Sequence, residues 1–526
     1  MIVDVDWEEI PQRLRRKFYL DYVEGKGKAS SFFTHEPTDY EAALTHREAY
    51  DYPRRELVEQ LLRYNRQLGA GEQALTNIRS LQQPSTFCVI AGQQVGFLGG
   101  PMYTTYKIIS TIRLAAHLNQ TLPVHTVPMF WMATEDHDFD EINHVYYFQP
   151  DGEMGQLDFS WDKQGSPIAD LGITEEIEDA FQTYFDRLTP GTHHAATRDR
   201  FAPQEGEDYC TWHGRLWSSL FADYGLVIVE PRILRPLGAH IFQAALKRTK
   251  EMTYRLQGVA KDLAAADYEV LLPVEDAGRP FTFDAQGNRV RVQEPAVHVD
   301  KASSHPERYS TDAALRPLFA DAILPIVVSV LGPGEITYHA MLKPLYDLFD
   351  IPQPLFFPRK SYTLVRGSER DNMERYGITP KQLLTREPDP SDVLNEFTFE
   401  SGTDLFGVAR EQVEKAFAPL RPYVKDIDPS MTRSWEWAVN NALRGINKLE
   451  ESSTRALMSQ KGLSKGEIHV LQNVVLPRDR LQERVLPLPH FTNIHGLGLV
   501  DELATAGALD DFRHHILVVE EKDARD

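Results

Sequence analysis

Residues 135–144 hold the densest group of side chains that could do chemistry. They read Glu-Asp-His-Asp-Phe-Asp-Glu-Ile-Asn-His, with five carboxylates and two histidines, directly after the apolar run 127–132. Like charges this close repel one another and are costly to remove from water. The pattern therefore favours a functional site over a solvated acidic loop. If the segment is helical, His137, Glu141 and His144 share one face.

Two kinds of chemistry fit this segment. Carboxylates and histidine can bind a substrate amine and accept its proton. For that reaction the candidate catalytic residues are His137, Asp138, Asp140 and Glu141, with Glu135 and His144 as substrate contacts. Oxygen and imidazole ligands can instead hold a divalent metal, so the alternative function is a metal-dependent hydrolase that uses residues 135–144. Both interpretations stay open at this point, and we assign no metal ligand.

A glycine-rich turn follows an earlier apolar run, 87–91. Gly92-Gln-Gln leads through Gly99-Gly-Pro into a helical run. Backbone N–H groups at such a strand-to-helix turn can bind an anion or a polar ligand, although the spacing is neither GxGxxG nor a Walker loop. The predicted nucleotide-binding residues here are Gly92, Gly99, Gly100 and Lys107, and the predicted substrate contacts are Gln93, Gln94 and Tyr103.

Two further apolar runs end in polar residues. Run 324–331 precedes Gly332, and the following Glu335 and Tyr338 are candidate substrate contacts. Run 354–357 precedes Arg359 and Lys360, which could bind a nucleotide phosphate. A surface loop without a ligand is an equally good interpretation of that pair. Because open α/β sheets bind ligands at the carboxyl ends of their strands, we expect these segments to share one site.

The elements that must position these residues alternate between apolar runs and helical segments. Runs 87–91 and 127–132, joined by a helical segment, form a β–α–β unit that implies a parallel pair. Residues 1–364 therefore predict an α/β core with a parallel sheet, insertions near 150–205 and 265–305, and one long helix over 239–263.

The composition changes after this core. Trp435, Val439, Ala442, Ile446 and Leu449 follow one another at spacings of 4, 3, 4 and 3 residues, which is a heptad seam. We expect residues 365–475 to form a helical domain with an antiparallel hairpin that is suited to a homodimer. Residues 476–526 are expected to return to the core.

The composition excludes several other classes of protein. The 526 residues carry a net charge of −21, which makes a nucleic-acid or anionic-membrane surface unexpected. No apolar run is long enough for a membrane span, and the acidic N-terminus lacks a signal-peptide pattern. Cys88 and Cys210 form no CxxC pair. These features predict a cytoplasmic protein.

The motifs resemble those of the cysteine ligase family of bacillithiol biosynthesis, the bacillithiol cysteine-adding enzymes. The matching segments span most of the chain: 91–94, 100–107, 130–144, 224–227, 315–318, 332–335, 342–345 and 481–484. The resemblance implies a Rossmann-like core similar to class I aminoacyl-tRNA synthetases and nucleotidyltransferases. It also implies a helical coiled-coil domain and a homodimer.

The same resemblance implies a reaction. Cysteine would be joined to the amine of glucosaminyl malate, both small molecules, in the last step of bacillithiol synthesis. An amide needs an activated carboxyl group, so ATP or another nucleotide is expected as cofactor. Neither signature of the class I synthetases is literally present in the chain, and an adenylate and an acyl phosphate both remain open as intermediates. A third interpretation is a coiled-coil scaffold without enzymatic activity.

Overall fold

The computed structural model describes residues 1–162, 165–386, 404–461 and 465–520. The chain divides into two compact units. One unit comprises Met1–Leu364 together with Arg480–Asp526, and the other comprises Val365–Asp479.

A five-stranded parallel sheet lies at the centre of the first unit. Its strands are, in spatial order, β11 (Leu355–Pro358), β10 (Ile326–Leu331), β2 (Thr86–Gln93), β3 (His125–Met132) and β6 (Val227–Val229). Every neighbouring pair is parallel, as in the register that pairs Ala91 with Phe130 and Val330 with Phe357. The predicted Rossmann-like α/β core is thereby confirmed. The direction in which successive strands are added reverses between β2 and β10, the point where such sheets bind ligands.

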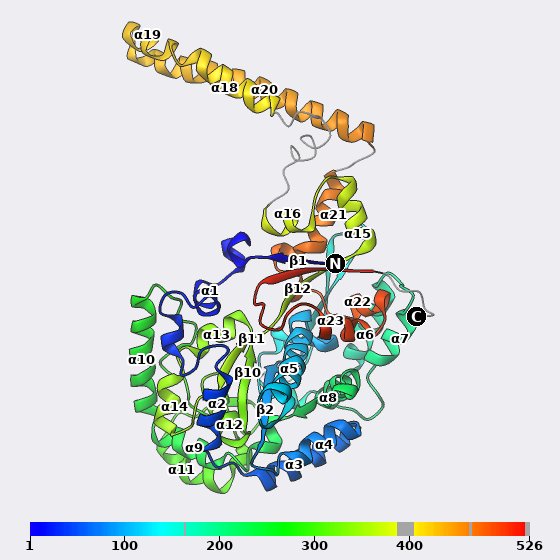
Figure 1. The fold of residues 1–526 in the computed structure, drawn as a ribbon, viewed down its shortest axis with the longest axis vertical. Helices are drawn as coiled ribbons and strands as arrows, with labels where there is room; N and C mark the ends of the chain where they lie inside the picture. The colour runs from blue at the N-terminus through cyan, green and yellow to red at the C-terminus, as the bar shows by residue number, and fades with distance from the viewer. Residues whose placement is uncertain (163–164, 387–403, 462–464, 521–526) are drawn as a thin grey trace. The chain divides into compact units, whose positions relative to one another are not determined.

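Helices cover this sheet, which accounts for the apolar sequence of its strands. Strand β2 is buried from Thr86 to Ala91, which is why it reads as a continuous apolar run. Helix α5 (Met102–Thr121) contacts β2, β3 and β10 (Figure 1). Other helices that contact the sheet are α2 (Tyr40–Glu48) against β10, and α3 (Arg54–Gln67), α4 (Glu72–Ser80) and α8 (Tyr209–Leu220) against β6.

A second sheet joins the two ends of the chain. Strand β1 (Ile2–Val5) pairs antiparallel with β13 (His514–Val519), and Figure 1 shows this red C-terminal strand beside the blue N-terminal one. Strand β12 (Ser361–Arg366) completes the sheet on the other side of β13. Because β12 follows β11 almost directly, the segment around Arg359 connects the two sheets.

The insertions contain small antiparallel sheets and helices. Strands β4 (His144–Phe148) and β5 (Met154–Asp158) pair, followed by α6 (Glu175–Arg187) and α7 (His194–Phe201). Strand β7 (Phe281–Phe283) pairs with β8 (Arg289–Arg291) and β9 (Tyr309–Ser310), and α11 (Pro295–Ser304) lies between the last two. Further helices of this unit are α1 (Lys17–Val23), α12 (Leu315–Ile323), α13 (Pro333–His339), α14 (Lys343–Phe349), α22 (Leu488–His495) and α23 (Leu499–Thr505).

The single long helix expected over 239–263 is wrong. The segment forms two helices, α9 (Ala239–Lys247) and α10 (Thr249–Ala265). Arg248 separates them with a φ of −108° and a ψ of 14°, outside helical geometry. Its guanidinium group donates a hydrogen bond to the carbonyl of Leu348, so a contact distant in the sequence accompanies the break.

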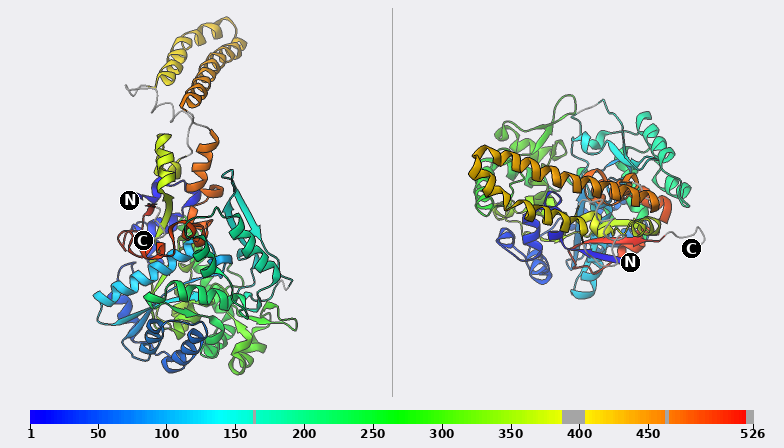
Figure 2. Two further views of the ribbon diagram at one scale, coloured as in Figure 1. Left: turned by 90° about the vertical axis from the view of Figure 1, so that its right-hand side faces the viewer. Right: turned by 90° about the horizontal axis from the view of Figure 1, so that it is seen from above.

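The second unit contains the predicted helical hairpin. Helices α18 (Leu405–Phe417) and α20 (Thr432–Lys461) lie side by side in Figure 2, with α19 (Leu420–Ile427) between them in the chain. The indole N–H of Trp435 donates to the carbonyl of Phe417 at 2.8 Å. Within the described part of this unit, the other α-helices are α15 (Gly367–Arg375), α16 (Pro380–Thr385) and α21 (Lys465–Val475). Among the described residues of both units, no helix is long and apolar enough to cross a membrane.

Candidate active site

A cavity of about 600 Å³ lies beyond the carboxyl ends of β2 and β10. The end of β2, the start of α5 and the segment after β3 contribute to its wall, together with α12, α13 and the chain from Arg480 onward. The structure thus brings together the strand ends that the sequence predicted to share a site. The predicted residues that line it are Gly92, Gln93, Gln94, Gly100, Tyr103, Lys107, Asp140, Glu141, His144, Glu335, Tyr338 and Arg359.

Lys107 forms the floor of this cavity. Its ammonium group lies 2.5 Å from a Glu335 carboxylate oxygen and donates to Gly92 O at 2.8 Å and to Gln93 Oε1 at 2.7 Å. These three acceptors use the three N–H bonds of the ammonium group. Burial lowers the pKa of Lys107 to about 8 even though Glu335 favours the charged form. Its main role in this structure is therefore to join α5 to β2 and α13.

Carboxylates from the segment after β3 line one side of the cavity: Asp136, Asp140 and Glu141. Gln94 Nε2 donates to Asp136 at 3.1 Å, which ties this segment to the end of β2. Burial would raise the pKa of Asp136, but the charge of Arg289 and a hydrogen bond from the backbone N–H of His137 hold it below its usual value. Desolvation, and then the charge of Asp138, raise the pKa of Glu141. The cavity therefore contains a firmly ionised carboxylate and a more basic one.

The helix considered for residues 135–144 is not formed. The segment contains only a short 3-10 turn over Phe139–Glu141. Backbone hydrogen bonds from Ile168 to Asp136 O, at 2.8 Å, and from Phe97 to Ile142 O, at 3.0 Å, tie this irregular segment to other parts of the chain. His137 and His144 consequently do not share a face.

His137 and Glu135 line a smaller cavity of about 190 Å³, which shares Asp136 and Arg316 with the main one. Arg289 Nη1 donates to His137 Nδ1 at 3.0 Å, so Nδ1 acts as an acceptor there. Glu135 is buried and accepts from Arg235 at 2.7 Å, which makes it a structural anchor. Asp138 is exposed and lines neither cavity.

Three arginines that residue types and spacing did not predict also line the main cavity: Arg316, Arg480 and Arg484. Arg316 Nη2 donates to Tyr338 Oη at 3.1 Å. Arg480 and Arg484 form no ion pair with any residue that the structure describes. The guanidinium group of Arg484 lies 5.6 Å from the ring centre of Tyr103. Arg316 and Arg484 lie within the family motifs at 315–318 and 481–484, and that position in the sequence could have identified them as site residues.

Several amides of the glycine-rich turn are not free to bind a ligand. The N–H groups of Gly96, Phe97, Gly100 and Met102 already donate to backbone carbonyls. Gly99 does not line the cavity, and a side chain there would clash, because its Cβ would lie 2.9 Å from the Trp217 ring. Its φ of 87° also favours glycine. These observations give Gly99 a packing role.

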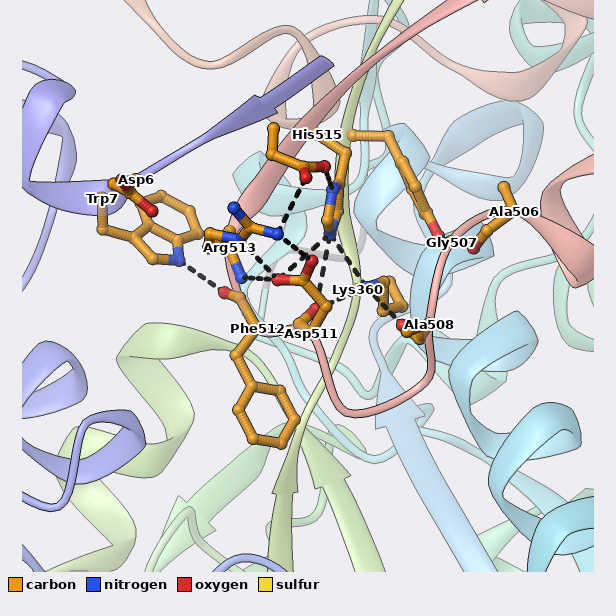
Figure 3. A network of polar contacts seen from close by, with 12 residues as sticks. Asp6, Trp7, Lys360, Ala506, Gly507, Ala508, Asp511, Phe512, Arg513 and His515 are labelled. Carbon is orange, nitrogen blue, oxygen red and sulfur yellow. Dashed lines mark hydrogen bonds and ion pairs between the residues drawn. The ribbon is translucent and has the colours of Figure 1, made fainter. Parts of the chain in front are cut away.

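Arg359 and Lys360 are both buried, so the surface-loop interpretation is wrong. Arg359 lines the cavity, but its guanidinium group forms two hydrogen bonds to Glu483, at 2.6 and 2.9 Å. Lys360 does not line the cavity. Figure 3 shows its ammonium group among the carbonyls of Ala508 and Asp511 and the ring of His515. The predicted nucleotide contact of Lys360 is therefore replaced by a structural one.

The metal interpretation of residues 135–144 does not fit this geometry. His137 lines the smaller cavity and His144 the main one, where His144 Nδ1 lies 3.1 Å from Asp140 O. Among the residues that the structure describes, the group with three suitably close ligand atoms is Asp4, Asp511 and His515, in the terminal sheet. Lys360 Nζ lies 2.9 Å from His515 Nε2 and Arg513 lies 2.8 Å from Asp4, so cations already occupy that position.

Known protein families and relatives match nearly the whole chain. The family model described as bacillithiol biosynthesis BshC, N-terminal Rossmann-like domain, matches residues 5–360, and the C-terminal coiled-coil domain model of BshC matches residues 362–519. The chain is 28% identical over 545 residues to a Geobacillus thermodenitrificans protein named "Putative cysteine ligase BshC", covering 97% of this chain and 99% of the relative. Relatives of the same name from Koribacter versatilis (28% over 521 residues, 95% of this chain and 96% of the relative) and Salinibacter ruber (27% over 530 residues, 95% and 96%) are similar.

Proposed function

Because the chain belongs to the BshC family of bacillithiol biosynthesis and is a ligase, we propose that it joins the carboxyl group of cysteine to the amine of glucosaminyl malate. This reaction is the last step of bacillithiol synthesis. A carboxylate and an amine do not condense unaided in water, so we also propose that a nucleotide, most simply ATP, activates the cysteine carboxyl group.

The observation that supports this proposal best is the distribution of charge in the main cavity. Carboxylates of Asp136, Asp140 and Glu141 are available for an ammonium group, whereas Arg316, Arg480 and Arg484 are available for carboxylates or phosphates. Glucosaminyl malate carries an amine and two carboxylates, and a nucleotide carries phosphates. A volume of about 600 Å³ lies within the range of small-molecule sites.

The amine must lose a proton before it attacks the activated carboxyl group. We propose Glu141 as the acceptor, since it lines the main cavity and its raised pKa makes it a better base than Asp136. Asp136 and Asp140 would bind the ammonium form. His137 lines the smaller cavity. From that side His137 and Arg289, which contact each other, would hold the Asp136 carboxylate in position.

The reaction balances in two steps. The cysteine carboxylate attacks ATP and releases either pyrophosphate, leaving an adenylate, or ADP, leaving an acyl phosphate. The neutral amine then forms the C–N bond, and AMP or inorganic phosphate leaves. Arg480 and Arg484, which are exposed at the cavity and unpaired among the described residues, are the candidate phosphate contacts.

The test uses purified protein with glucosaminyl malate, ATP and cysteine that carries ¹⁸O in its carboxyl group. Mass spectrometry should find the amide product, and one ¹⁸O atom should appear in AMP or in phosphate, which identifies the intermediate. No amide, with ATP or with any other nucleoside triphosphate, contradicts the proposal. Amide formation without transfer of ¹⁸O contradicts the activation step alone.

The second unit supports a proposal about assembly. We propose that the protein is a homodimer formed through residues 365–475. The start of the predicted heptad seam faces α18 within the hairpin, where Trp435 donates to Phe417, whereas the last seam residue, Leu449, is exposed. Large apolar side chains nevertheless remain exposed in this unit, including Trp437 at 68% and Leu449 at 61%. A second copy would cover such side chains.

We also propose that the protein works in the cytoplasm. Cys88 and Cys210 are both buried as free thiols, which suits a reducing compartment. ATP is also available there.

A further inference from the structure

A small cavity of about 70 Å³ adjoins the main one. The two cavities share Gly92, Arg316, Glu335 and Tyr338, which therefore lie at the boundary between them. Away from this boundary most of the wall is apolar, and it also includes Ser329 and the buried Asp321. The apolar residues are Ile90, Ala91, Pro317, Ala320, Ile326 and Leu331. The boundary therefore carries charged groups, and most of the remaining wall is hydrocarbon.

Two buried polar atoms belong to residues that line this small cavity. Trp131 Nε1 and His339 Nδ1 have no hydrogen-bond partner among the described residues, and each of these residues is 4% exposed. Leaving a buried polar atom unpaired costs free energy, and native proteins seldom do so without a reason. Trp131 is at the end of β3 and His339 at the end of α13, so both are held by the elements that build the main site.

We propose that this small cavity is the thiol pocket for the cysteine substrate. The inference rests on the proposed function, which supplies cysteine as the amino acid. With the –CH2–SH side chain inside, the α-ammonium group would lie near Glu335 and the α-carboxylate near Arg316, the two charged residues that line both cavities. The carboxyl group would then face the main cavity, where the nucleotide and the attacking amine are proposed to bind.

The chemistry of a thiol matches this pocket. Sulfur is a weak acceptor and S–H a weak donor, so the indole N–H of Trp131 can donate to sulfur. Burial lowers the pKa of His339 to about 3, so its ring is neutral and its Nδ1 can accept from S–H. A cavity of roughly 150 Å³ holds benzene, so about half that volume suits a two-atom side chain.

The same features select against other amino acids. Homocysteine and methionine would overfill the cavity. Serine fits by size, but its hydroxyl loses more hydration against apolar walls than a thiol does. Because a small pocket discriminates poorly between near-isosteres, the preference for cysteine over serine should be on the order of 100-fold at most.

The test compares cysteine with 2-aminobutyrate, which has a methyl group in place of the thiol. Dissociation constants are measured by calorimetry on the full chain, and KM values in the ligation assay. In Trp131→Phe, affinity for cysteine should fall about three- to tenfold, the loss of one neutral hydrogen bond, whereas affinity for 2-aminobutyrate should hardly change. Trp437→Phe is the matched control, because Trp437 is exposed on α20. It should leave the ratio of the two affinities unchanged.

A second variant fills the pocket. Ala320→Leu places a larger side chain in its wall and should weaken binding of both amino acids by tenfold or more, while the KM for glucosaminyl malate stays constant. Equal losses of cysteine and 2-aminobutyrate in Trp131→Phe, or normal cysteine binding by Ala320→Leu, would overturn the thiol pocket and leave the proposed function standing. Selective cysteine binding without any amide product would instead retain the pocket and reject the proposed reaction. Failure of the unmodified protein to bind cysteine, alone or with ATP, rejects the pocket directly.

Discussion

The ammonium group of Lys107 lies 2.5 Å from the carboxylate of Glu335, which joins α5 to α13 at the floor of the main cavity. Lys107 is almost fully buried, whereas the Glu335 side chain is 23% exposed. Burial lowers the pKa of Lys107 to about 8, and Lys107 in turn holds the pKa of Glu335 below its usual value despite burial. The pair is therefore charged near neutral pH. It fixes α5 and α13 relative to each other, next to the ends of β2 and β10.

Breaking this pair should destabilise the first unit. Lys107→Met leaves the Glu335 carboxylate without its counter-charge, and the expected loss is about 3 kcal/mol, read as a lower thermal unfolding midpoint. The double variant Lys107→Met/Glu335→Gln should recover part of that loss. Lys261→Met, at an exposed position on α10, is the control. A midpoint for Lys107→Met equal to that of the control would refute a structural role for the pair.

Arg484 should contribute to binding of an anionic substrate. Arg484→Ala removes a cation from the cavity, and a hydrogen bond to a charged group contributes about 1.5–3 kcal/mol, so KM for ATP or glucosaminyl malate should rise about tenfold or more. Steady-state kinetics with each substrate varied in turn shows which anion is bound. Arg66→Ala, an exposed arginine on α3 outside the cavity, should change neither KM.

Glu141 and His137 should differ in their effects on turnover. If Glu141 accepts the proton of the amine, Glu141→Gln lowers kcat by about 10²–10⁴, and His137→Asn lowers it by less. In the unmodified protein, activity should fall as the pH falls through the raised pKa of Glu141, because the protonated acid cannot accept a proton. That acidic limb should disappear in Glu141→Gln. The reverse order of the two variants would assign the base to His137.

Lys360 should make stability depend on pH. Burial lowers its pKa to about 8 in the folded protein, whereas an unfolded lysine has a pKa near its ordinary value of about 10.4. Between these two values the unfolded chain binds more protons, so this group increases stability as the pH rises. From about pH 8 to about pH 10, the unfolding midpoint of Lys360→Met should therefore rise less, or fall more, than that of the unmodified protein. If the difference in unfolding midpoint between the two proteins stays constant across that range, the lowered pKa of Lys360 is contradicted. The control Lys261→Met should show the same pH dependence as the unmodified protein.

The proposed homodimer can be tested on the exposed apolar side chains of α20. Multi-angle light scattering of the unmodified protein at micromolar concentration should give twice the mass of the chain. The double variant Trp437→Ser/Leu449→Ser should give a monomer, because both side chains are exposed and their loss should leave the hairpin folded. Ile446→Asp acts differently: Ile446 is half-buried on the seam of the hairpin, so the charge should unfold the hairpin itself. A monomeric unmodified protein would disprove the dimer.

The sequence alone determined the elements and the place of the site. Strands β2 and β3 read as continuous apolar runs because helices cover both faces of the sheet, and that signal is local in the chain. Parallel strands end at the same edge, so Gly92 and Glu335 were expected near each other and both line the cavity.

Only the tertiary structure decided which polar groups face the cavity. Glu141 lines it and His137 does not, because hydrogen bonds from Ile168 and Phe97 tie the intervening backbone to distant segments in an irregular path that helical spacing could not foresee. Arg359 pairs with Glu483, 124 residues later in the chain. Such pairings depend on which distant segments meet, and hydrophobic periodicity reports only on neighbours along the chain.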